Sequence, residues 1–276
     1  MNKITPTIAK ANTSHIDILK KLWKDGFGDD EKYIDFFFAN KFSDCIPLVV
    51  LNKDIAIGAA YLMPVSTYEF SKFKKGYYAY AITISPEYRK LGFGKFLIEA
   101  MCSYATDNNK FIILCPADEK LCDYYASCGF IENAYITRKI IYPENKFEKM
   151  DYIDLDTTTF KQLRDKCFEK NIIWDSKSLK YVISENKITH GQSICITHNR
   201  NKYYLIMHCH DDYIEIKESN VPYALLNSFT NFLCNKFGGS YCAWSLPYKN
   251  SGDEAILYGM SYNLQKDNYY LNLILN

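Results

Sequence analysis

One short stretch of the chain, residues 80–97, places glycines and basic residues where they could bind an anion. A β-rich apolar run ends at Pro86, a turn containing Gly92 and Gly94 follows, and an amphipathic helical pattern starts at once. The first N–H groups of a helix lack intrahelical partners, and the helix dipole is positive there. Glycines let a phosphate approach the backbone, and Arg89 and Lys90 add positive charge. The spacing therefore predicts a phosphate-binding turn.

The same spacing excludes two common phosphate-binding motifs. A P-loop needs a glycine five residues before Gly94 and a hydroxyl two residues after it, but Arg89 and Phe96 stand there. A dinucleotide-binding fingerprint needs a small residue three positions after Gly94, where the chain has Leu97. What remains is the pattern Arg89-x-x-Gly92-x-Gly94 directly after a strand.

This pattern resembles the coenzyme A pyrophosphate loop of the GNAT N-acetyltransferase superfamily. Farther along, Tyr125 lies four residues before Gly129 and Phe130, as a tyrosine does in the closing segment of that superfamily. Two predicted helices and a strand meander precede the loop, as the GNAT fold requires. The resemblance covers roughly the first half of the chain and implies an α/β (α+β) protein whose mixed central sheet is flanked by helices.

The resemblance also assigns roles to individual residues. Main-chain groups of Ile82, Thr83 and Ile84 would hold the pantetheine arm of acetyl-CoA, the co-substrate, and polarise its thioester. Tyr125, an O–H donor of high reference pKa, would protonate the leaving sulfur. Main-chain N–H groups of seven consecutive residues would bind the pyrophosphate: Arg89, Lys90, Leu91, Gly92, Phe93, Gly94 and Lys95.

The general base is not evident from the sequence. Many relatives place a carboxylate on the strand before the loop, but here that strand offers hydroxyl groups: Tyr77, Tyr78, Tyr80 and Thr83. Glu69, Asp118 and Glu119 are candidates for a base that acts through water. The terminal carboxylate of Asn276 is a fourth candidate, because the terminal carboxylate has this part in relatives with additional C-terminal domains.

The apolar patterns predict the elements that position these residues. A helix over 14–23, with Ser14 as its cap, precedes a second helix that begins near Asp29 or Asp30. The first half continues with strands over 46–51, 56–68 and 77–85, the helix after the turn, a strand over 111–114, a helix over 119–127 and a strand pair over 130–142. The second half has helices over 157–170, 177–185 and 223–236 and strands over 192–198, 203–208, 213–218, 240–245, 255–263 and 269–275.

A polar break at 143–146 suggests a boundary between a GNAT acetyltransferase domain over 1–145 and a second domain over 146–276. The order of elements in the second half echoes the first, which resembles larger GNAT proteins that carry a degenerate copy of the fold. Residues 217–222 stand in the place of the pyrophosphate loop but lack its paired glycines. We therefore expect no coenzyme A there, and expect this accessory domain to wall the acceptor cleft.

Composition narrows the function classes further. Among 276 residues, 33 Lys and Arg oppose 32 Asp and Glu, so the basic excess typical of nucleic-acid binding is missing. No apolar run approaches the ~20 residues of a spanning helix, and residues 1–21 show no secretion signal. The 10 cysteines include no C-x-x-C pair and read as buried thiols of a reducing compartment. We expect a soluble, cytoplasmic protein that binds neither nucleic acid nor membrane.

Three further clusters have structural interpretations beside functional ones. His208, Cys209 and His210 are the only metal-like group, but a strand edge that enters a polar turn explains them, so no metal site is predicted. The acidic residues 29–31 either attract an amine or cap a helix. Four aromatic residues near them are predicted to lie in the core and not in a substrate cage: Trp23, Phe27, Tyr33 and Phe37.

Taken together, the residues and the resemblance predict an N-acetyltransferase that transfers acetyl directly from acetyl-CoA to a primary amine of a small molecule or peptide. The missing base leaves open an alternative, a non-catalytic acyl-CoA-binding sensor or regulatory module. An acyltransferase for longer chains is a second alternative. The sequence predicts neither the identity of the acceptor nor the oligomeric state.

Overall fold

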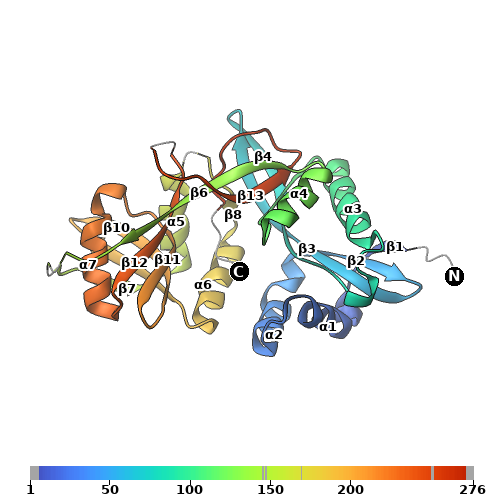
Figure 1. Ribbon diagram of the computed structural model, residues 1–276, viewed down its shortest axis with the longest axis horizontal. Coiled ribbons are helices and arrows are strands. Elements are labelled where there is room, and N and C mark those ends of the chain that lie inside the picture. The colour runs from blue at the N-terminus through green and yellow to red at the C-terminus, as the bar shows by residue number, and fades with distance from the viewer. Residues whose placement is uncertain (1–5, 145, 147, 169, 250–251, 272–276) are drawn as a thin grey trace. The chain divides into compact units, whose positions relative to one another are not determined.

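A computed structural model of the chain describes residues 6–144, 146, 148–168, 170–249 and 252–271 (Figure 1). The chain forms two compact units. Unit 1 consists of Met1–Asn133 and Gly259–Lys266, and unit 2 consists of Ala134–Tyr258 and Asp267–Asn276. Each unit contains a mixed sheet with helices packed on it, so the predicted α/β class is confirmed.

Unit 1 has a sheet in the order β1-β2-β3-β4-β5-β13. Neighbouring strands are antiparallel except for β4 and β5, which are parallel. The elements in chain order are β1 (Thr7–Lys10), η1 (Thr13–His15), α1 (Ile16–Phe27), α2 (Glu31–Asn40), η2 (Phe42–Asp44), β2 (Ile46–Asn52), β3 (Ile55–Glu69), β4 (Lys72–Ile84), η3 (Pro86–Tyr88), α3 (Phe93–Asp107), β5 (Phe111–Leu114), α4 (Glu119–Ser127) and β13 (Ile256–Tyr262).

Helices cover both faces of this sheet. Tyr80 of β4 contacts Trp23 of α1, with ring centroids 5.5 Å apart, whereas Tyr77 contacts Tyr104 of α3 at 6.0 Å. Because side chains alternate along a strand, residues 77 and 80 point to opposite faces, and so α1 and α3 lie on opposite sides of β4 (Figure 1). The α1 face is aromatic, since Trp23 and Phe37 are both buried against Tyr61 of β3.

The order of strands and α-helices in unit 2 follows that of unit 1, with one α-helix fewer and the two-residue strand β8 in addition. Its sheet runs β6-β12-β11-β10-β9-β7, and only β11 and β12 are parallel. The elements are β6 (Ile131–Ile141), β7 (Asp151–Asp154), α5 (Thr157–Cys167), β8 (Ile173–Trp174), α6 (Ser176–Ile188), β9 (Gln192–His198), β10 (Asn201–Cys209), β11 (Tyr213–Ser219), η4 (Tyr223–Leu225), α7 (Leu226–Phe237) and β12 (Tyr241–Pro247).

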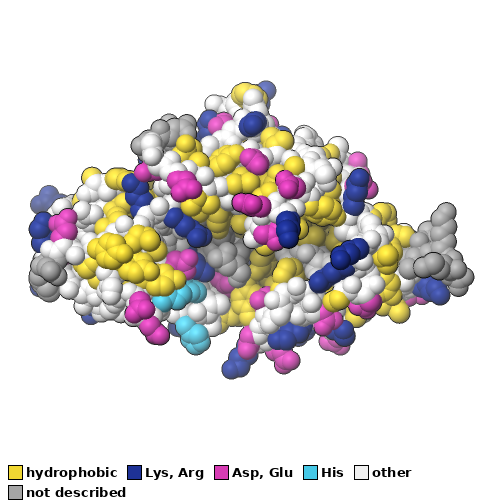
Figure 2. All heavy atoms as spheres, viewed as in Figure 1, with side chains coloured by type: hydrophobic (Ala, Val, Ile, Leu, Met, Phe, Trp, Pro, Cys, Tyr) yellow, Lys and Arg dark blue, Asp and Glu magenta, His cyan; other side chains and the backbone are white. Residues whose placement is uncertain are grey.

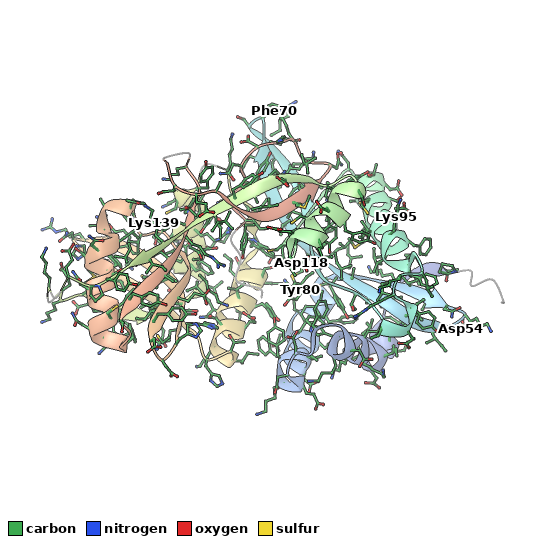
Figure 3. All side chains as sticks on the ribbon, viewed as in Figure 1. Asp54, Phe70, Tyr80, Lys95, Asp118 and Lys139 are labelled. Atoms are coloured by element: carbon green, nitrogen blue, oxygen red, sulfur yellow. The ribbon has the colours of Figure 1, made fainter. Side chains whose placement is uncertain are left out.

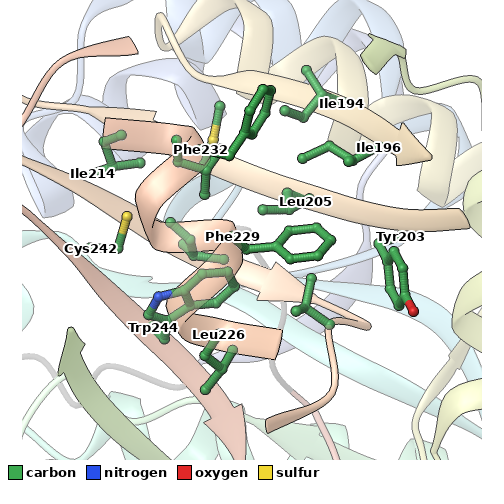
Figure 4. Close-up of a cluster of buried hydrophobic side chains, with 14 of the residues drawn as sticks. Ile194, Ile196, Tyr203, Leu205, Ile214, Leu226, Phe229, Phe232, Cys242 and Trp244 are labelled. Atoms are coloured by element: carbon green, nitrogen blue, oxygen red, sulfur yellow. The ribbon is translucent and has the colours of Figure 1, made fainter. Parts of the chain in front are cut away.

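The core of unit 2 lies between α7 and one face of its sheet (Figure 4). Phe229 of α7 is fully buried beside Leu205 of β10 and Trp244 of β12. The indole N–H of Trp244 donates to Thr230 Oγ1 at 3.0 Å, which satisfies the one polar group of that side chain. On the other face, Phe160 of α5 packs on Tyr204 of β10, with ring centroids 4.9 Å apart.

The sheets of the two units take strands from unexpected parts of the sequence. β13 follows unit 2 along the chain, yet it pairs with β5 of unit 1, with Met260 opposite Leu114. β6 follows α4 of unit 1, yet it pairs with β12 of unit 2, with Cys242 opposite Ile141. Residues 259–266 are fastened to unit 1 by further hydrogen bonds, among them Asn263 Nδ2 to the carbonyl of Lys110 at 2.7 Å.

Most predicted elements are present, and the differences have local causes. The expected strand pair over 130–142 is wrong, because the segment forms one continuous strand, β6. The expected cap Ser14 is also wrong: Asn12 accepts from the Ser14 amide at 2.9 Å and starts η1, which leads into α1. The strand expected over 269–275 lies partly outside the described residues, and Tyr270 forms an isolated bridge with Asn171.

The charges on the surface and the hydropathy of the helices agree with what the composition predicts. Lys and Arg side chains are interspersed with Asp and Glu on the face shown in Figure 2. Among the described residues, the helices lack the combined length and apolar character that crossing a bilayer demands.

The strand exchange makes a prediction about the fragment 1–145, which contains the whole predicted acetyltransferase domain but lacks β13. We expect it to aggregate or to unfold without a cooperative transition, because the β5 backbone that pairs with residues 260–262 is left exposed. Circular dichroism melting and light scattering measure this. The control is the same fragment with residues 254–266 attached through a flexible Gly/Ser linker, which we expect to aggregate less and to regain a cooperative transition, while β6 still lacks its partner β12. A stable monomer of 1–145 alone would contradict the prediction.

Candidate functional site

The parallel strands β4 and β5 part before they reach the predicted anion-binding turn. Their register covers Gly76 opposite Phe111 to Tyr78 opposite Ile113, whereas β4 continues to Ile84. On its other edge β4 stays paired with β3 as far as Ile84 opposite Gly58. Along residues 81–84, one edge of β4 therefore has no strand partner in the described register. Its N–H and C=O groups are available to a ligand, since backbone polar groups need partners.

A β-bulge reshapes β4 within this open stretch. The register passes from Tyr80 opposite Tyr61 to Thr83 opposite Ala59, so Ala81 and Ile82 both face Ala60. Ala81 has φ +48°, a left-handed conformation that costs a residue with a Cβ about 1–3 kcal/mol. Bulges bend a strand and redirect its backbone groups. Ile82, Thr83 and Ile84, predicted to hold the pantetheine arm, are the residues that follow or form this bulge.

The turn itself presents the unsatisfied N–H groups of α3. Lys90 has φ +63° and Gly92 has φ +88°, and Gly92 caps α3 without a side-chain hydrogen bond. The first backbone hydrogen bond of the helix runs from the Phe96 amide to the Gly92 carbonyl at 3.1 Å. The N–H groups of the helical residues before Phe96 (Phe93, Gly94 and Lys95) consequently lack intrahelical acceptors. Unpaired N–H groups at the start of a helix can bind an anion.

The charges around the turn favour an anion. No acidic residue occupies the first turn of α3. Arg89 and Lys90 are exposed, and Arg89 Nε donates to the Ile84 carbonyl at 3.0 Å, which ties the turn to the end of β4. Lys95 projects from the first turn of α3 (Figure 3) and is 58% exposed, 3.9 Å from Glu99. The dipole and the three cations act in the same direction.

Helix α4 carries two tyrosines in different environments. Tyr125 is buried, packed on Phe130 with ring centroids 5.7 Å apart, and its hydroxyl has no hydrogen bond to any part of the chain that the structure describes. Burial raises the pKa of Tyr125, so its hydroxyl stays protonated at neutral pH. Tyr124 is half-buried, and its hydroxyl lies at the first turn of α3: a Cβ built on Gly94 would be 2.9 Å from it. The spacing argument favours Tyr125 and misses this second contact.

Of the candidate general bases, Glu69 lies far from the turn, and Asp118 already accepts a hydrogen bond from the backbone. Glu69 pairs with Lys72 at the far end of the β3–β4 hairpin, about 40 Å of strand from Ile84. It also forms an ion pair with Lys74 at 2.9 Å, which lowers its pKa against the effect of burial. Asp118 (Figure 3) accepts from the Leu121 amide at 2.8 Å as the cap of α4. Glu119 is exposed in the first turn of α4, and Asn276 lies outside the described residues.

The acidic and aromatic residues before and within α2 are largely structural. Asp30 caps α2 by accepting from the Lys32 amide at 2.7 Å, and Asp29 accepts from the Trp23 indole at 2.7 Å. The hydroxyls of Tyr33 and Tyr80 are 2.6 Å apart. The core assignment is confirmed for Trp23, Tyr33 and Phe37, but Phe27 is 47% exposed and is a surface residue.

The sequence that replaces the loop in unit 2 gives a different geometry. After β11 ends at Ser219, Pro222 precedes η4, and α7 begins after Leu225 without a glycine. In the same unit, His208 Nε2 donates a hydrogen bond to Asn186 Oδ1 at 2.9 Å, and burial lowers the pKa of His208 to about 4. Within the described part of the chain, no three His, Cys, Asp or Glu side chains are placed to hold a metal ion.

Comparisons with known proteins bear on the family and on the fold. Residues 13–130 match the family model of the acetyltransferase (GNAT) family. A search of curated proteins finds no match. Among solved structures, a probable N-acyltransferase of Enterococcus faecalis V583 is similar over 93% of this chain and 72% of its own, with 12% identity and a TM-score of 0.76.

Two further solved structures are similar in fold over most of this chain. A GCN5-related N-acetyltransferase from Anabaena variabilis is 14% identical over 95% of this chain and 73% of its own, with a TM-score of 0.72. A tandem GNAT protein from the clavulanic acid biosynthesis pathway is 10% identical over 94% of this chain and 98% of its own, with a TM-score of 0.56. At these identities the likeness shows the fold, and it confirms the predicted GNAT fold.

The left-handed cap of α3 gives a prediction about stability. Gly92→Ala is expected to lower the free energy of unfolding by about 1–2 kcal/mol, because φ +88° disfavours a Cβ although no atom lies within 4 Å of one. Gly92→Asn is the matched control and should cost less, since asparagine adopts this conformation more readily. Urea denaturation measures both. Equal stability of Gly92→Ala and wild type would contradict the strain described here.

Proposed function

We propose that this protein, whose residues 13–130 match the model of the acetyltransferase (GNAT) family, is an acetyl-CoA-dependent N-acetyltransferase that acts on a primary amine of a small molecule or peptide by direct transfer. The amine acceptor, the transferred acetyl group and the roles of individual residues are all inferred. We also propose that the predicted boundary near residue 145 separates the acetyltransferase domain from an accessory domain.

One observation carries the proposal: the free edge of β4 leads directly into the free N–H groups of α3. The edge at residues 81–84 offers alternating donors and acceptors suited to an extended chain with amide groups, such as pantetheine. The turn at residues 89–95 offers clustered N–H donors and cations suited to a diphosphate. Coenzyme A joins these two chemical groups in one molecule, in the same order.

The reaction assigns a task to each part of the site. Acetyl-CoA supplies a thioester, an acyl group activated for attack by an amine. Backbone groups at the bulge, from Ile82 to Ile84, polarise the carbonyl as a C–N bond forms and the C–S bond breaks. Tyr125 O–H donates its proton to the departing thiolate, and the proton lost by the amine passes to water. Arg89 to Lys95 hold the diphosphate and so fix the position of the reacting carbonyl.

A second candidate function, an acyl-CoA-binding sensor without catalysis, has one observation in its favour. Among residues 80–84 of β4, the polar side chains are Tyr80 and Thr83, and neither is a carboxylate. Thr83 is buried beside α1, where a Cβ on Gly26 would meet its Oγ1. A sensor would bind acetyl-CoA tightly and form no acetylated product when a panel of polyamines, aminoglycosides, amino acids and peptides is screened by mass spectrometry.

Binding of coenzyme A should depend on the glycine in the first turn of α3. Gly94→Val is expected to weaken the affinity at least 100-fold, about 2.7 kcal/mol, because a branched side chain blocks the free N–H groups and also meets the Tyr124 hydroxyl. Isothermal titration calorimetry measures this. Asn227→Val, at the corresponding second position of α7, is the control and should bind normally.

A melting curve by circular dichroism is recorded for each variant, so that loss of folding is separated from loss of binding. Wild-type affinity in folded Gly94→Val would refute the assignment of the turn. Loss of binding in Asn227→Val would place the ligand in unit 2 instead.

Tyr125→Phe should lower kcat about 10²-fold or more, the range of general acid catalysis, and leave the affinity for coenzyme A nearly unchanged. Tyr124→Phe, the matched control on the same helix, should retain most of kcat. Steady-state kinetics with calorimetry measures the two quantities. An equal loss of kcat and affinity in Tyr125→Phe would argue against the acid role.

The pH dependence gives a second readout of the same group. Burial raises the pKa of Tyr125 above its ordinary value of 10, so the proton remains available as pH rises. The wild-type rate should show no descending limb below pH ~10. A limb near pH 8 that disappears in Tyr125→Phe would mean that the hydroxyl ionises there, contrary to the effect of its burial.

A further inference from the structure

Unit 2 contains its own pair of parting parallel strands. β11 and β12 pair from Tyr213 opposite Tyr241 to Ile216 opposite Trp244, but β11 continues to Ser219 and β12 to Pro247. β11 also carries a bulge here, because the register with β10 shifts between Ile206 and Met207. The carboxyl ends of parallel strands are a common location for ligand sites in α/β proteins. Unit 2 thus keeps the strand geometry of unit 1 without its glycine turn.

A cavity of about 220 Å³ opens where these strands end. Its walls come from the end of β11 and the following residues 219–223, from Leu246 and Pro247 of β12, and from Cys167 and Phe168 at the end of α5. A second cavity of about 340 Å³ adjoins it, sharing Cys167, Phe168, Pro247 and Lys249. Ligand sites in proteins commonly measure ~300–1,000 Å³, so the two together suit a small organic molecule.

One wall of the smaller cavity holds a polar atom that lacks a partner. Ser219 is 3% exposed, and its Oγ has no hydrogen bond with any described residue. A buried hydroxyl without a partner is unfavourable, and a bound ligand group that hydrogen-bonds to it removes this cost. A rotation about χ1 that turns this hydroxyl toward the cavity would let a ligand group serve as its partner.

The strand end that carries Ser219 is rigidly held. The neighbouring Glu218 is fully buried and accepts from Arg164 Nε at 2.8 Å and from the Tyr204 hydroxyl at 2.7 Å. Arg164 Nη1 donates to the Ile172 carbonyl at 2.7 Å. Asn220 Oδ1 accepts from the Tyr204 amide at 2.6 Å. The cavity is consequently preformed, which lowers the entropy that a ligand must lose on binding.

The remaining lining defines the chemistry of the ligand. Phe168, Val221 and Leu246 form an apolar surface. Lys249 lines both cavities and supplies a positive charge, whereas the carboxylate of Asp253 is paired with Lys139 at 2.9 Å. An anion is therefore favoured over a cation. The diverging backbones of β11 and β12 suit a secondary amide, which both donates and accepts.

We propose that unit 2 binds a small N-acylated amino acid at the parted ends of β11 and β12, with its amide between the strands and Ser219, its side chain on Phe168 and Leu246, and its carboxylate toward Lys249. All of these residues belong to unit 2, so the proposal is independent of the reaction assigned to unit 1. The site differs from a coenzyme A site because no glycine turn receives a diphosphate.

Cysteine labelling tests this on the full chain. The expectation that all ten cysteines are buried is wrong for Cys167 and Cys209, which are exposed. Cys167 lines both cavities, and Cys209, in the same unit, lines neither. Burial raises the thiol pKa of both, which makes them a matched pair. The probe is N-acetyl-L-leucine, and the rate of iodoacetamide modification is followed by peptide mass spectrometry. We expect Cys167 labelling to slow more than ~5-fold at probe concentrations well above Kd, with Cys209 unchanged.

Two related probes and two variants make the result specific. L-Leucine lacks the amide and N-acetyl-L-leucinamide lacks the carboxylate, and each should require at least ~10-fold higher concentration, about 1.4 kcal/mol. Ser219→Ala and Lys249→Gln should weaken the protection by N-acetyl-L-leucine to a similar degree. Absence of protection, equal protection by all three molecules, or full protection in both variants would overturn the proposal.

Discussion

The separation of two parallel strands is the constraint on which the rest of unit 1 depends. β4 pairs with β5 only as far as Tyr78, so the last residues of β4 carry polar backbone groups with no strand on one side. Such an edge is tolerated where a ligand or solvent completes it. The bulge at Ala81 aims this edge, and the glycine cap at Gly92 starts α3 where the strand ends. Under the proposed function, the open strand and the open helix start form one continuous surface for the extended, anionic carrier.

The same strand geometry occurs in both units, but the connection after the central strand differs. In unit 1 the chain passes through Lys90 and Gly92 in left-handed conformations and leaves the start of α3 uncovered. In unit 2 it passes through Val221 and Pro222, and side chains narrow the corresponding space to a cavity of about 220 Å³. If both proposals hold, a duplicated fold keeps one architecture and separates two binding chemistries, a diphosphate-bearing carrier in one unit and a smaller acid in the other.

Local pattern predicted much of this structure. The bounds of β5, α4 and β9 agree with the apolar periodicity, because each is a short run flanked by turn residues or a cap such as Asp118. β1 and β7 are four-residue strands without clear alternation, and their pairing depends on distant partners. The exchange of β6 and β13 is non-local and leaves no local signal. At the site, the glycine turn is visible in sequence, but the bulge at Ala81 is not, since alanine rarely adopts a positive φ.

Hydrogen–deuterium exchange with and without coenzyme A tests the central claim most directly, that free backbone groups of β4 and α3 bind the carrier. The account predicts slower exchange confined to amides within residues 82–84 and 89–95, the open edge and the turn, and no change at residues 219–226. Exchange that is unchanged in the turn, or protection that falls on residues 219–226 instead, would contradict it.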